Sequence, residues 1–321
     1  MIDSAAFLSY LNRANDVLNG KTDKNDLTEI VGRLPSLNEN LLEQLAQVAE
    51  EAALFDARRA WAIALVADSA ARTCDLLLQS RAAWVLGRAY NHCGQPKKVA
   101  ETIARARQGF EELHETGWVA ACDWQLNHLA WTKPNFDDAA RELETALTSL
   151  EQAELNDFAS QCRLALSYAQ ILCGNFGAAQ ENLAICEETF ITQSDPINQA
   201  RCWLNEASCQ RRQGNFENAH AKLEQALAAF RQCEAPLEVA KTHYQLGLWY
   251  FLSGRDYPQA VTYFEQACVV FAAQGMDLWT AVCENGLAQI NIQSGNLTQA
   301  IQQLQRARPA FVEHGALGMM A

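Results

Sequence analysis

The sequence repeats itself every forty residues, and this period limits the possible folds more than any other feature. Turn-forming residues recur at intervals of 40, 40, 40, 40 and 41, at Gly94, Pro134, Gly174, Gly214, Gly254 and Gly295. A fixed period of this length is typical of architectures in which each repeat buries its apolar face against the next repeat. The 321 residues would suggest about two domains by length alone. The period instead predicts one elongated array.

Three columns of residues follow each turn at helical spacing. Small residues come first, at Val99, Ala139, Ala179, Ala219, Ala260 and Ala300. Bulky residues follow four positions later, at Ile103, Leu143, Leu183, Leu223, Phe264 and Leu304. A second small residue comes three positions further on, at Ala106, Ala146, Cys186, Ala226, Ala267 and Ala307. Such residues share one helix face, where small side chains admit a neighbouring helix and the large one fills the space.

Each repeat is therefore predicted to be a helix A, a turn and a helix B. The segments Leu86-Gly87-Arg88-Ala89-Tyr90 and Leu246-Gly247-Leu248-Trp249-Tyr250 lie in helix A, and Pro196 and Pro236 mark where helices A begin. No sustained alternation of apolar and polar residues predicts a strand. The pattern L-G-x-x-Y, then Gly, then Ala-x3-bulky-x2-Ala resembles the tetratricopeptide repeat (TPR), whose usual period is about 34 residues. The resemblance implies an all-α, right-handed, TPR-like superhelical solenoid of antiparallel helix pairs.

Two groups of proteins have long repeats of this kind. One is the bacterial arrays that precede caspase-like CHAT peptidase domains, and the other is the sensor arrays of ATP-dependent transcription activators. The phrase SRAAWVLGRAYNHCGQPKKVAETIARARQGFEEL and the glycine-terminated segments AAQG (272–275) and VEHG (312–315) resemble the CHAT-associated arrays most. This resemblance implies a bacterial regulatory region whose effector, a CHAT-type peptidase, acts in cis or in trans.

The repeat pattern divides the chain into four parts. Residues 1–38 are expected to form N-terminal capping helices, 39–78 a degenerate helix pair, and 79–316 six TPR-like repeats. Ala120, Ala200, Ala240 and Ala281 occupy one position of successive helices A, and the next such position is Ala321. We therefore expect residues 317–321 to start a truncated seventh repeat. The alternative is that they form a frayed tail.

Composition excludes several classes of function. The chain has 38 Asp and Glu against 25 Lys and Arg, a formal charge of −13, which argues against a protein that coats nucleic acid or an anionic membrane. No apolar stretch is long enough to span a membrane. The eleven cysteines form no C-x-x-C motif, and the N-terminus does not resemble a signal peptide, so we expect reduced thiols in a cytoplasmic protein.

No catalytic motif stands out. There is no P-loop, dinucleotide fingerprint, H-E-x-x-H or G-x-S-x-G. His92 and Cys93 are adjacent, but neighbouring residues on a helix point about 100° apart and do not face each other. Asp137 and Asp138 begin a predicted helix B, and acids are favoured at a helix N-terminus. We therefore interpret them as helix-terminus residues and not as metal ligands. We expect no enzymatic activity, no cofactor and no metal.

A ligand site is predicted on the inner face of the helices A, which lines the concave surface of a TPR-like solenoid. The second, fifth, ninth, twelfth and thirteenth residues of the six helices A give thirty positions, with six Lys or Arg and no Asp or Glu. Aromatic residues lie between the basic ends. The candidate partner-binding residues are Arg81, Trp84, Arg88, Trp124, His128, Trp131, Tyr168, Arg201, Arg211, Arg212, Lys241, Tyr244 and Phe251. The alternative is that the tryptophans pack between helices A and the arginines pair with outer acids.

These residues predict a protein or peptide partner with acidic and apolar groups, bound in a groove that regulates an effector. Trp84 and Arg88 stand where the carboxylate clamp of chaperone-binding TPR proteins has Lys and Asn, so chaperone-tail binding is not expected. One alternative function is a sensor array of a transcription activator that binds a small anionic metabolite. Another is a plain assembly scaffold.

Overall fold

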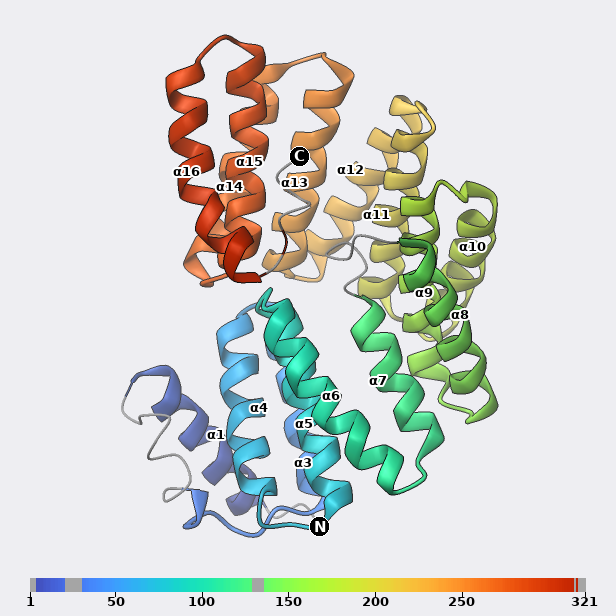
Figure 1. Cartoon of the computed structure of the whole chain (residues 1–321), viewed down its shortest axis with the longest axis vertical. Coiled ribbons are helices and arrows are strands. Elements are labelled where there is room, and N and C mark those ends of the chain that lie inside the picture. Colours follow the sequence, from blue (N-terminus) through green and yellow to red (C-terminus); the bar gives the residue numbers. More distant parts are fainter. Residues whose placement is uncertain (1–3, 21–30, 129–135, 315, 317–321) are drawn as a thin grey trace. The chain divides into compact units, whose positions relative to one another are not determined.

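The structure is a computed structural model that describes residues 4–20, 31–128, 136–314 and 316. Over these residues it consists of fifteen helices without a strand, which confirms the predicted all-α fold class of helix pairs (Figure 1). The chain divides into two compact units, Met1–Cys122 and Asp123–Ala321. The predicted seventh repeat at 317–321 lies outside the described residues.

The first unit is built from helices that pack against their neighbours in the sequence. It contains α1 (Ser4–Leu18), α3 (Glu39–Ala53), α4 (Ala57–Ala71), α5 (Leu76–His92), α6 (Pro96–Glu112) and the first part of α7 (Thr116–His128). Helix α3 packs against α4, α4 against α5, α5 against α6, and α1 against α4. The side chains of Asn38, Asp56 and Asp75 cap the N-termini of α3, α4 and α5 by accepting hydrogen bonds from backbone N–H groups.

The second unit continues the same alternation of helices A and B. After the end of α7 it contains α8 (Phe136–Gln152), α9 (Asn156–Cys173), α10 (Phe176–Thr192), α11 (Pro196–Arg212), α12 (Phe216–Gln232), α13 (Pro236–Ser253), α14 (Tyr257–Ala273), α15 (Asp277–Gln293) and α16 (Leu297–His314). From α8 to α16 each helix packs against the next, and the helices A of adjacent pairs, α9, α11, α13 and α15, also touch. Pro196 and Pro236 begin helices A as predicted. Pro309 lies inside α16, which continues to His314.

Both kinds of turn use a left-handed residue. The turn from helix A to helix B has glycine at φ 80° at Gly174 and 83° at Gly214, as the sequence predicts. The turn from helix B to helix A has the same conformation at ordinary residues, with φ 56° at Ser194 and 52° at Glu234. There the next residue closes the turn, as where the N–H of the buried Ala235 donates to the carbonyl of Phe230 at 2.9 Å.

The predicted small–large–small column forms the contact between helix pairs. Phe264 of α14 is fully buried, and it fills the space between Gly247 of α13 and Gly286 of α15. A Cβ atom would come within 2.8 Å of the Phe264 ring at either glycine. The two glycines are therefore required by the size of the side chain between them.

Replacing Gly286 with alanine tests this contact. Because the added methyl group would overlap the Phe264 ring, we expect the free energy of unfolding of the second unit to fall by about 1–2 kcal/mol, after the better helix propensity of alanine is included. Gly177→Ala on α10 is the matched control, since nothing lies within 4 Å of the added atom. The control should be neutral or stabilising in urea unfolding. Equal midpoints for Gly286→Ala and the wild type would contradict the contact.

Candidate functional site

In the first unit, acids from the preceding helix pair neutralise the predicted basic residues. Arg81 donates to Glu39 and Glu43 of α3 at 3.3 and 2.9 Å. Arg88 pairs with Glu50 of α3 at 2.8 Å. The two arginine side chains are 18% and 13% exposed. Both arginines thus pair with acids of α3, the helix A of the preceding pair, and not with the outer acids that the alternative supposed.

The two central tryptophans are packed within the array. Trp84 is 6% exposed and Trp124 is 3% exposed. The ring of Trp84 meets Trp118 of α7 edge-on at 5.4 Å, and the ring of Trp124 lies 6.0 Å from Phe158 of α9. The guanidinium of Arg88 also lies over the Trp84 ring at 4.9 Å. The fifth position of helix A thus lies between neighbouring helices A, so these two side chains stabilise the array by burial.

In the second unit, Arg201 and Lys241 share one buried carboxylate. Arg201 donates to Oε1 of Glu238 at 2.6 Å and Lys241 to the same atom at 3.1 Å, while the Glu238 side chain is 4% exposed. Burial acts to raise the pKa of Glu238, but the two cations outweigh it and hold that pKa well below its ordinary value of 4.5. These cations are therefore part of an ion-pair network that joins α11 to α13.

Four other predicted residues influence one another electrostatically, with no described acid among them, and are here called the Arg–Tyr cluster: Tyr168 of α9, Arg211 and Arg212 of α11, and Tyr244 of α13. Among the described residues, neither arginine forms an ion pair. Burial lowers the pKa of Arg211 and neighbouring Arg212 lowers it further, whereas Tyr168 and Tyr244 act in the opposite direction. Burial likewise raises the pKa of Tyr168 and of Tyr244.

The position of the two arginines at the end of α11 favours their positive charge. Arg211 and Arg212 lie in the last turn of α11, where positive charge interacts favourably with the helix dipole. Arg211 is half-buried and Arg212 is exposed. Three consecutive helices A thus bring two guanidinium groups and two phenol hydroxyls together, a donor set suited to a carboxylate or another anion.

The remaining candidates are placed individually. Phe251 is half-buried, with its ring 5.9 Å from that of Tyr257 on α14. His128 is the last residue of α7. Trp131 lies outside the described residues.

The acids that neutralise the predicted basic stripe were missed for identifiable reasons. Glu43 and Glu50 precede Arg81 and Arg88 by 38 residues. A strict period of forty residues therefore places the inner-stripe positions of that helix two residues away from these acids. A period of 38 residues at the degenerate helix pair would have assigned both glutamates to the inner stripe. Glu238 lies in the first turn of α13, outside the five positions assigned to the inner stripe.

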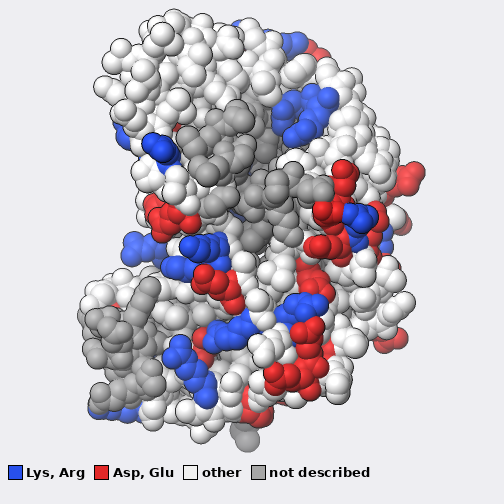
Figure 2. Space-filling view, viewed as in Figure 1, with Lys and Arg blue, Asp and Glu red and all other residues white. Residues whose placement is uncertain are grey.

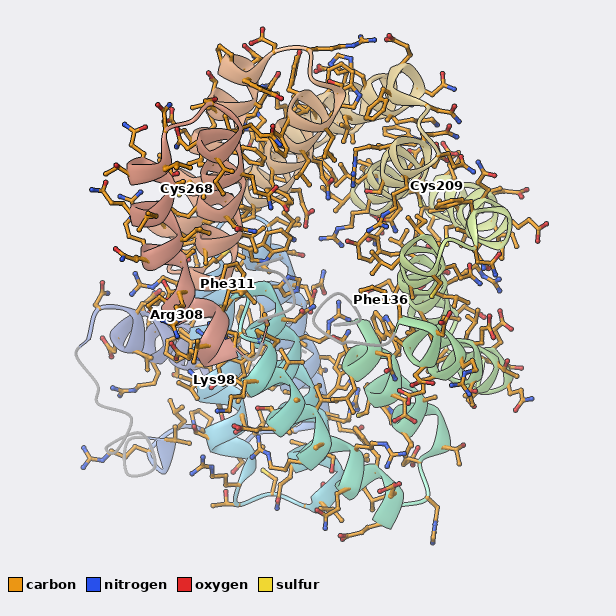
Figure 3. The ribbon with its side chains drawn as sticks, turned by 45° about the horizontal axis from the view of Figure 1, so that its top comes forward. Lys98, Phe136, Cys209, Cys268, Arg308 and Phe311 are labelled. Carbon is orange, nitrogen blue, oxygen red and sulfur yellow. The ribbon has the colours of Figure 1, made fainter. Side chains whose placement is uncertain are left out.

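The histidine and cysteine side chains are arranged for packing. His92 lies 3.3 Å from a carboxylate oxygen of Glu50, and burial raises the pKa of Cys93 to about 12. All eleven cysteines are free thiols. Burial also raises the pKa values of Cys209 on α11 and Cys268 on α14 (Figure 3), which makes these thiols poor nucleophiles at neutral pH. Among the described residues no group of His, Cys, Asp and Glu could hold a metal ion.

The described helices differ from those that span a membrane. In the part of the chain that the structure describes, none of them combines the length and the apolar character that crossing a bilayer requires.

Comparisons with known proteins support a TPR array. A tetratricopeptide repeat family model matches residues 238–311. No curated protein sequence matches the chain. A solved Rap protein complexed with competence and sporulation factor is 12% identical, covers 97% of this chain and 98% of its own, and has a TM-score of 0.64.

Two further solved structures share the fold. The Rap conjugation gene regulator of plasmid pLS20, in complex with the Phr* peptide, is 13% identical over 96% of this chain and 95% of its own, with a TM-score of 0.58. A Signal Transduction ATPase with Numerous Domains (STAND) protein with a tetratricopeptide repeat sensor, from Pyrococcus horikoshii, is 14% identical, with a TM-score of 0.57. That match covers 93% of this chain but 42% of the STAND protein.

Neutralising Glu238 tests the shared ion-pair network. Glu238→Gln should lower the free energy of unfolding by about 1–3 kcal/mol at pH 7, because two partly exposed cations lose their buried carboxylate. A carboxyl group whose pKa is lower in the folded state than in the unfolded state stabilises the fold at pH values above its ordinary pKa. This stabilisation is lost as the pH falls toward and through the pKa of the folded state. The difference from wild type should therefore stay constant between pH 6 and 8 and shrink below about pH 4.5.

The control for this measurement is Glu188→Gln, at an exposed position on α10. It should change the urea midpoint little at any pH. A Glu238→Gln defect that persists undiminished at pH 3 would show that packing, and not charge, links Arg201 and Lys241 to this residue.

Proposed function

We propose that this chain is a non-catalytic regulatory array that binds a peptide or protein segment on the inner faces of its helices A. The observation that carries the proposal is the Arg–Tyr cluster, where two cations without a carboxylate partner among the described residues meet two phenols on neighbouring helices. The ligand would place a carboxylate against Arg211 and Arg212. Its apolar groups would contact the aromatic surface of Tyr168, Tyr244 and Phe251.

The charge arrangement favours an anionic ligand at this place over the rest of the predicted stripe. Arg81, Arg88, Arg201 and Lys241 are already paired with acids, so a ligand carboxylate would have to compete with a protein carboxylate. Arg211 and Arg212 carry no such cost. Hydrogen bonds to charged groups contribute about 1.5–3 kcal/mol each, so this site is expected to contribute most of the affinity for an anion.

The solved relatives support a peptide as the ligand. Two Rap structures that share this fold over nearly the whole chain contain, by their descriptions, competence and sporulation factor or the Phr* peptide. We propose that this chain likewise binds a short segment of polypeptide. Its free thiols fit a cytoplasmic location.

The effector would respond to the ligand through a shift in equilibrium between conformations of the array. By its sequence resemblance to CHAT-associated arrays, the proposed effector is a CHAT-type caspase-like peptidase in cis or in trans. The similarity to a STAND protein with a repeat sensor favours a second candidate function, a sensor that detects a small anionic metabolite for an ATP-dependent transcription activator.

Removing the two free cations tests the proposed site. We expect a pool of hexapeptides carrying Glu and Leu or Phe to raise the melting temperature and to bind in calorimetry, whereas a matched pool with Gln in place of Glu binds more weakly. Arg211→Gln together with Arg212→Gln should weaken binding of the acidic pool at least tenfold, since one lost charge-assisted bond costs about 1.5–3 kcal/mol. Binding should also weaken with added salt.

The control is another pair of adjacent arginines, Arg58 and Arg59 on α4, which are both exposed. Changing both to Gln removes the same charge and should leave binding unchanged. Equal binding by the Arg211/Arg212 double variant at low salt would refute the site. Binding of small dicarboxylates or phosphates but of neither peptide pool would favour the metabolite sensor.

A further inference from the structure

One side of α16 exposes large apolar residues in a regular row. Leu297 is 59% exposed and Ile301 is 55% exposed, Leu304 is half-buried, and Arg308 is exposed. The spacings of four, three and four residues place all four on the same side of the helix. We call these residues the terminal face. Figure 2, viewed as in Figure 1, shows few charged side chains over helices α14 to α16.

Equivalent positions in the earlier helices B are covered. Leu304 is the sixth member of the bulky column, and its five predecessors, Ile103, Leu143, Leu183, Leu223 and Phe264, are at most 2% exposed. Helix A of the following repeat completes this cover. Over Phe264 it is provided by Gly286 of α15, together with Leu287 and Ile290.

In earlier repeats, the residues equivalent to Ile301 and Leu297 are also covered by the following helix A. On α12 the equivalent residues are His220 and Phe216. The His220 ring lies 4.4 Å from that of Trp249 on α13, and Trp249 donates to the Phe216 carbonyl at 2.7 Å. On α14 they are Val261 and Tyr257, which pack against the cluster that Phe264 forms with Leu287 and Ile290 of α15. In both cases the cover is an apolar pair three residues apart on a helix A, Leu246 and Trp249 or Leu287 and Ile290.

The end of α16 keeps the geometry of the earlier repeats. The N–H of Ala316 donates to the carbonyl of Phe311 at 2.9 Å, as Ala235 does to Phe230 and Met276 does to Phe271, each at 2.9 Å. Phe311 is fully buried and Ala316 is 2% exposed. Figure 3 marks Phe311 and Arg308 on this last stretch of α16. The terminal face is therefore held in the same register as the faces on which helices A pack.

The terminal face also carries a positive charge that the two preceding helices B lack. Arg308 occupies the position of Leu227 and Cys268 in the two preceding helices B, and it forms no ion pair with another described residue. One repeat earlier still, the equivalent residue Glu187 accepts a hydrogen bond at 2.7 Å from Trp203 of α11. A polar contact to the covering helix thus has a precedent at this position. Opposite an arginine, the matching group is a carboxylate.

We propose that the terminal face binds an amphipathic helix of a partner protein, antiparallel to α16, in the way that helices B bind the following helix A. The partner helix carries two apolar residues three positions apart that cover Leu297, Ile301 and Leu304. Nearer its N-terminus it carries an Asp or Glu that pairs with Arg308. This surface is separate from the Arg–Tyr cluster, so the proposal does not depend on the peptide-binding function.

A peptide copying α15, residues 277–293, is the probe. Its Leu287 and Ile290 cover the equivalent face of α14, and its Glu284 stands at the helix position of Trp203. We expect the fluorescein-labelled peptide to show saturable binding to the 321-residue chain in fluorescence anisotropy. Binding should be modest, because a 17-residue helix must become ordered as it binds. The same peptide with Leu287→Ser and Ile290→Ser should not bind.

Variants of the chain locate the binding. Ile301→Gln should weaken binding at least tenfold, and Arg308→Glu should weaken it several-fold. A peptide with Glu284→Arg should restore binding to the Arg308→Glu variant. Val269→Gln on α14, a position 69% exposed away from the terminal face, should bind normally. Because Ile301 and Arg308 are exposed, circular dichroism and urea midpoints should be unchanged in all variants.

Three outcomes would overturn the proposal. The first is that the α15 peptide does not bind. The second is that it binds Ile301→Gln as tightly as the wild type, or that charge reversal in the peptide fails to restore binding. The third is that sedimentation equilibrium shows a dimer that Ile301→Gln dissociates, since a second copy of the chain would then be the occupant.

Discussion

The rest of the fold depends on the contact made by the large side chain in the middle of a helix B that has a helix A on either side. Phe264 shows its requirements most clearly, because its ring leaves room only for Gly247 on one side and Gly286 on the other. Close packing makes such a contact intolerant of extra volume. The small residues and the close spacing of the helices follow from repeating this one contact.

The fold could be predicted because this contact leaves a regular pattern in the sequence. The bulky residue and its two small neighbours recur in every helix B, and glycines mark the turns from helix A to helix B. The opposite turn has a left-handed glycine at Gly275, but ordinary residues occupy that place in other repeats. Ser194 and Glu234 adopt left-handed conformations at φ 56° and 52°, and the backbone hydrogen bonds from Asp195 to Phe190 and from Ala235 to Phe230 close their turns. Residue type alone does not predict a left-handed serine or glutamate, because closure of the helix end by these backbone bonds imposes that conformation.

The candidate site was less predictable from the sequence, because acids outside the inner stripe decide whether its basic residues are neutralised. The inner positions contain six basic residues and no acid, yet Glu39, Glu43, Glu50 and Glu238 reach four of those cations from other positions. A count restricted to the stripe could not separate neutralised cations from free ones. It did include Arg211 and Arg212, the two without an ion pair among the described residues. Similarly, helical periodicity placed Trp84 and Trp124 toward the inner side, but contact between adjacent helices A buries them.

Tyr244 connects the proposed ligand site to the contacts that hold the repeats together. Its side chain belongs to the Arg–Tyr cluster, and its ring also lies 5.7 Å from Phe264 and 6.2 Å from Trp279 of α15. A ligand whose anion binds at Arg211 would draw Tyr244 toward it. This movement would change the contact between Tyr244 and Phe264, whose ring fills the space between α13 and α15. Packed interfaces change between discrete arrangements more readily than they deform continuously. Binding energy at the cluster could therefore alter the spacing of the last repeats, which is the physical step that a regulatory array requires.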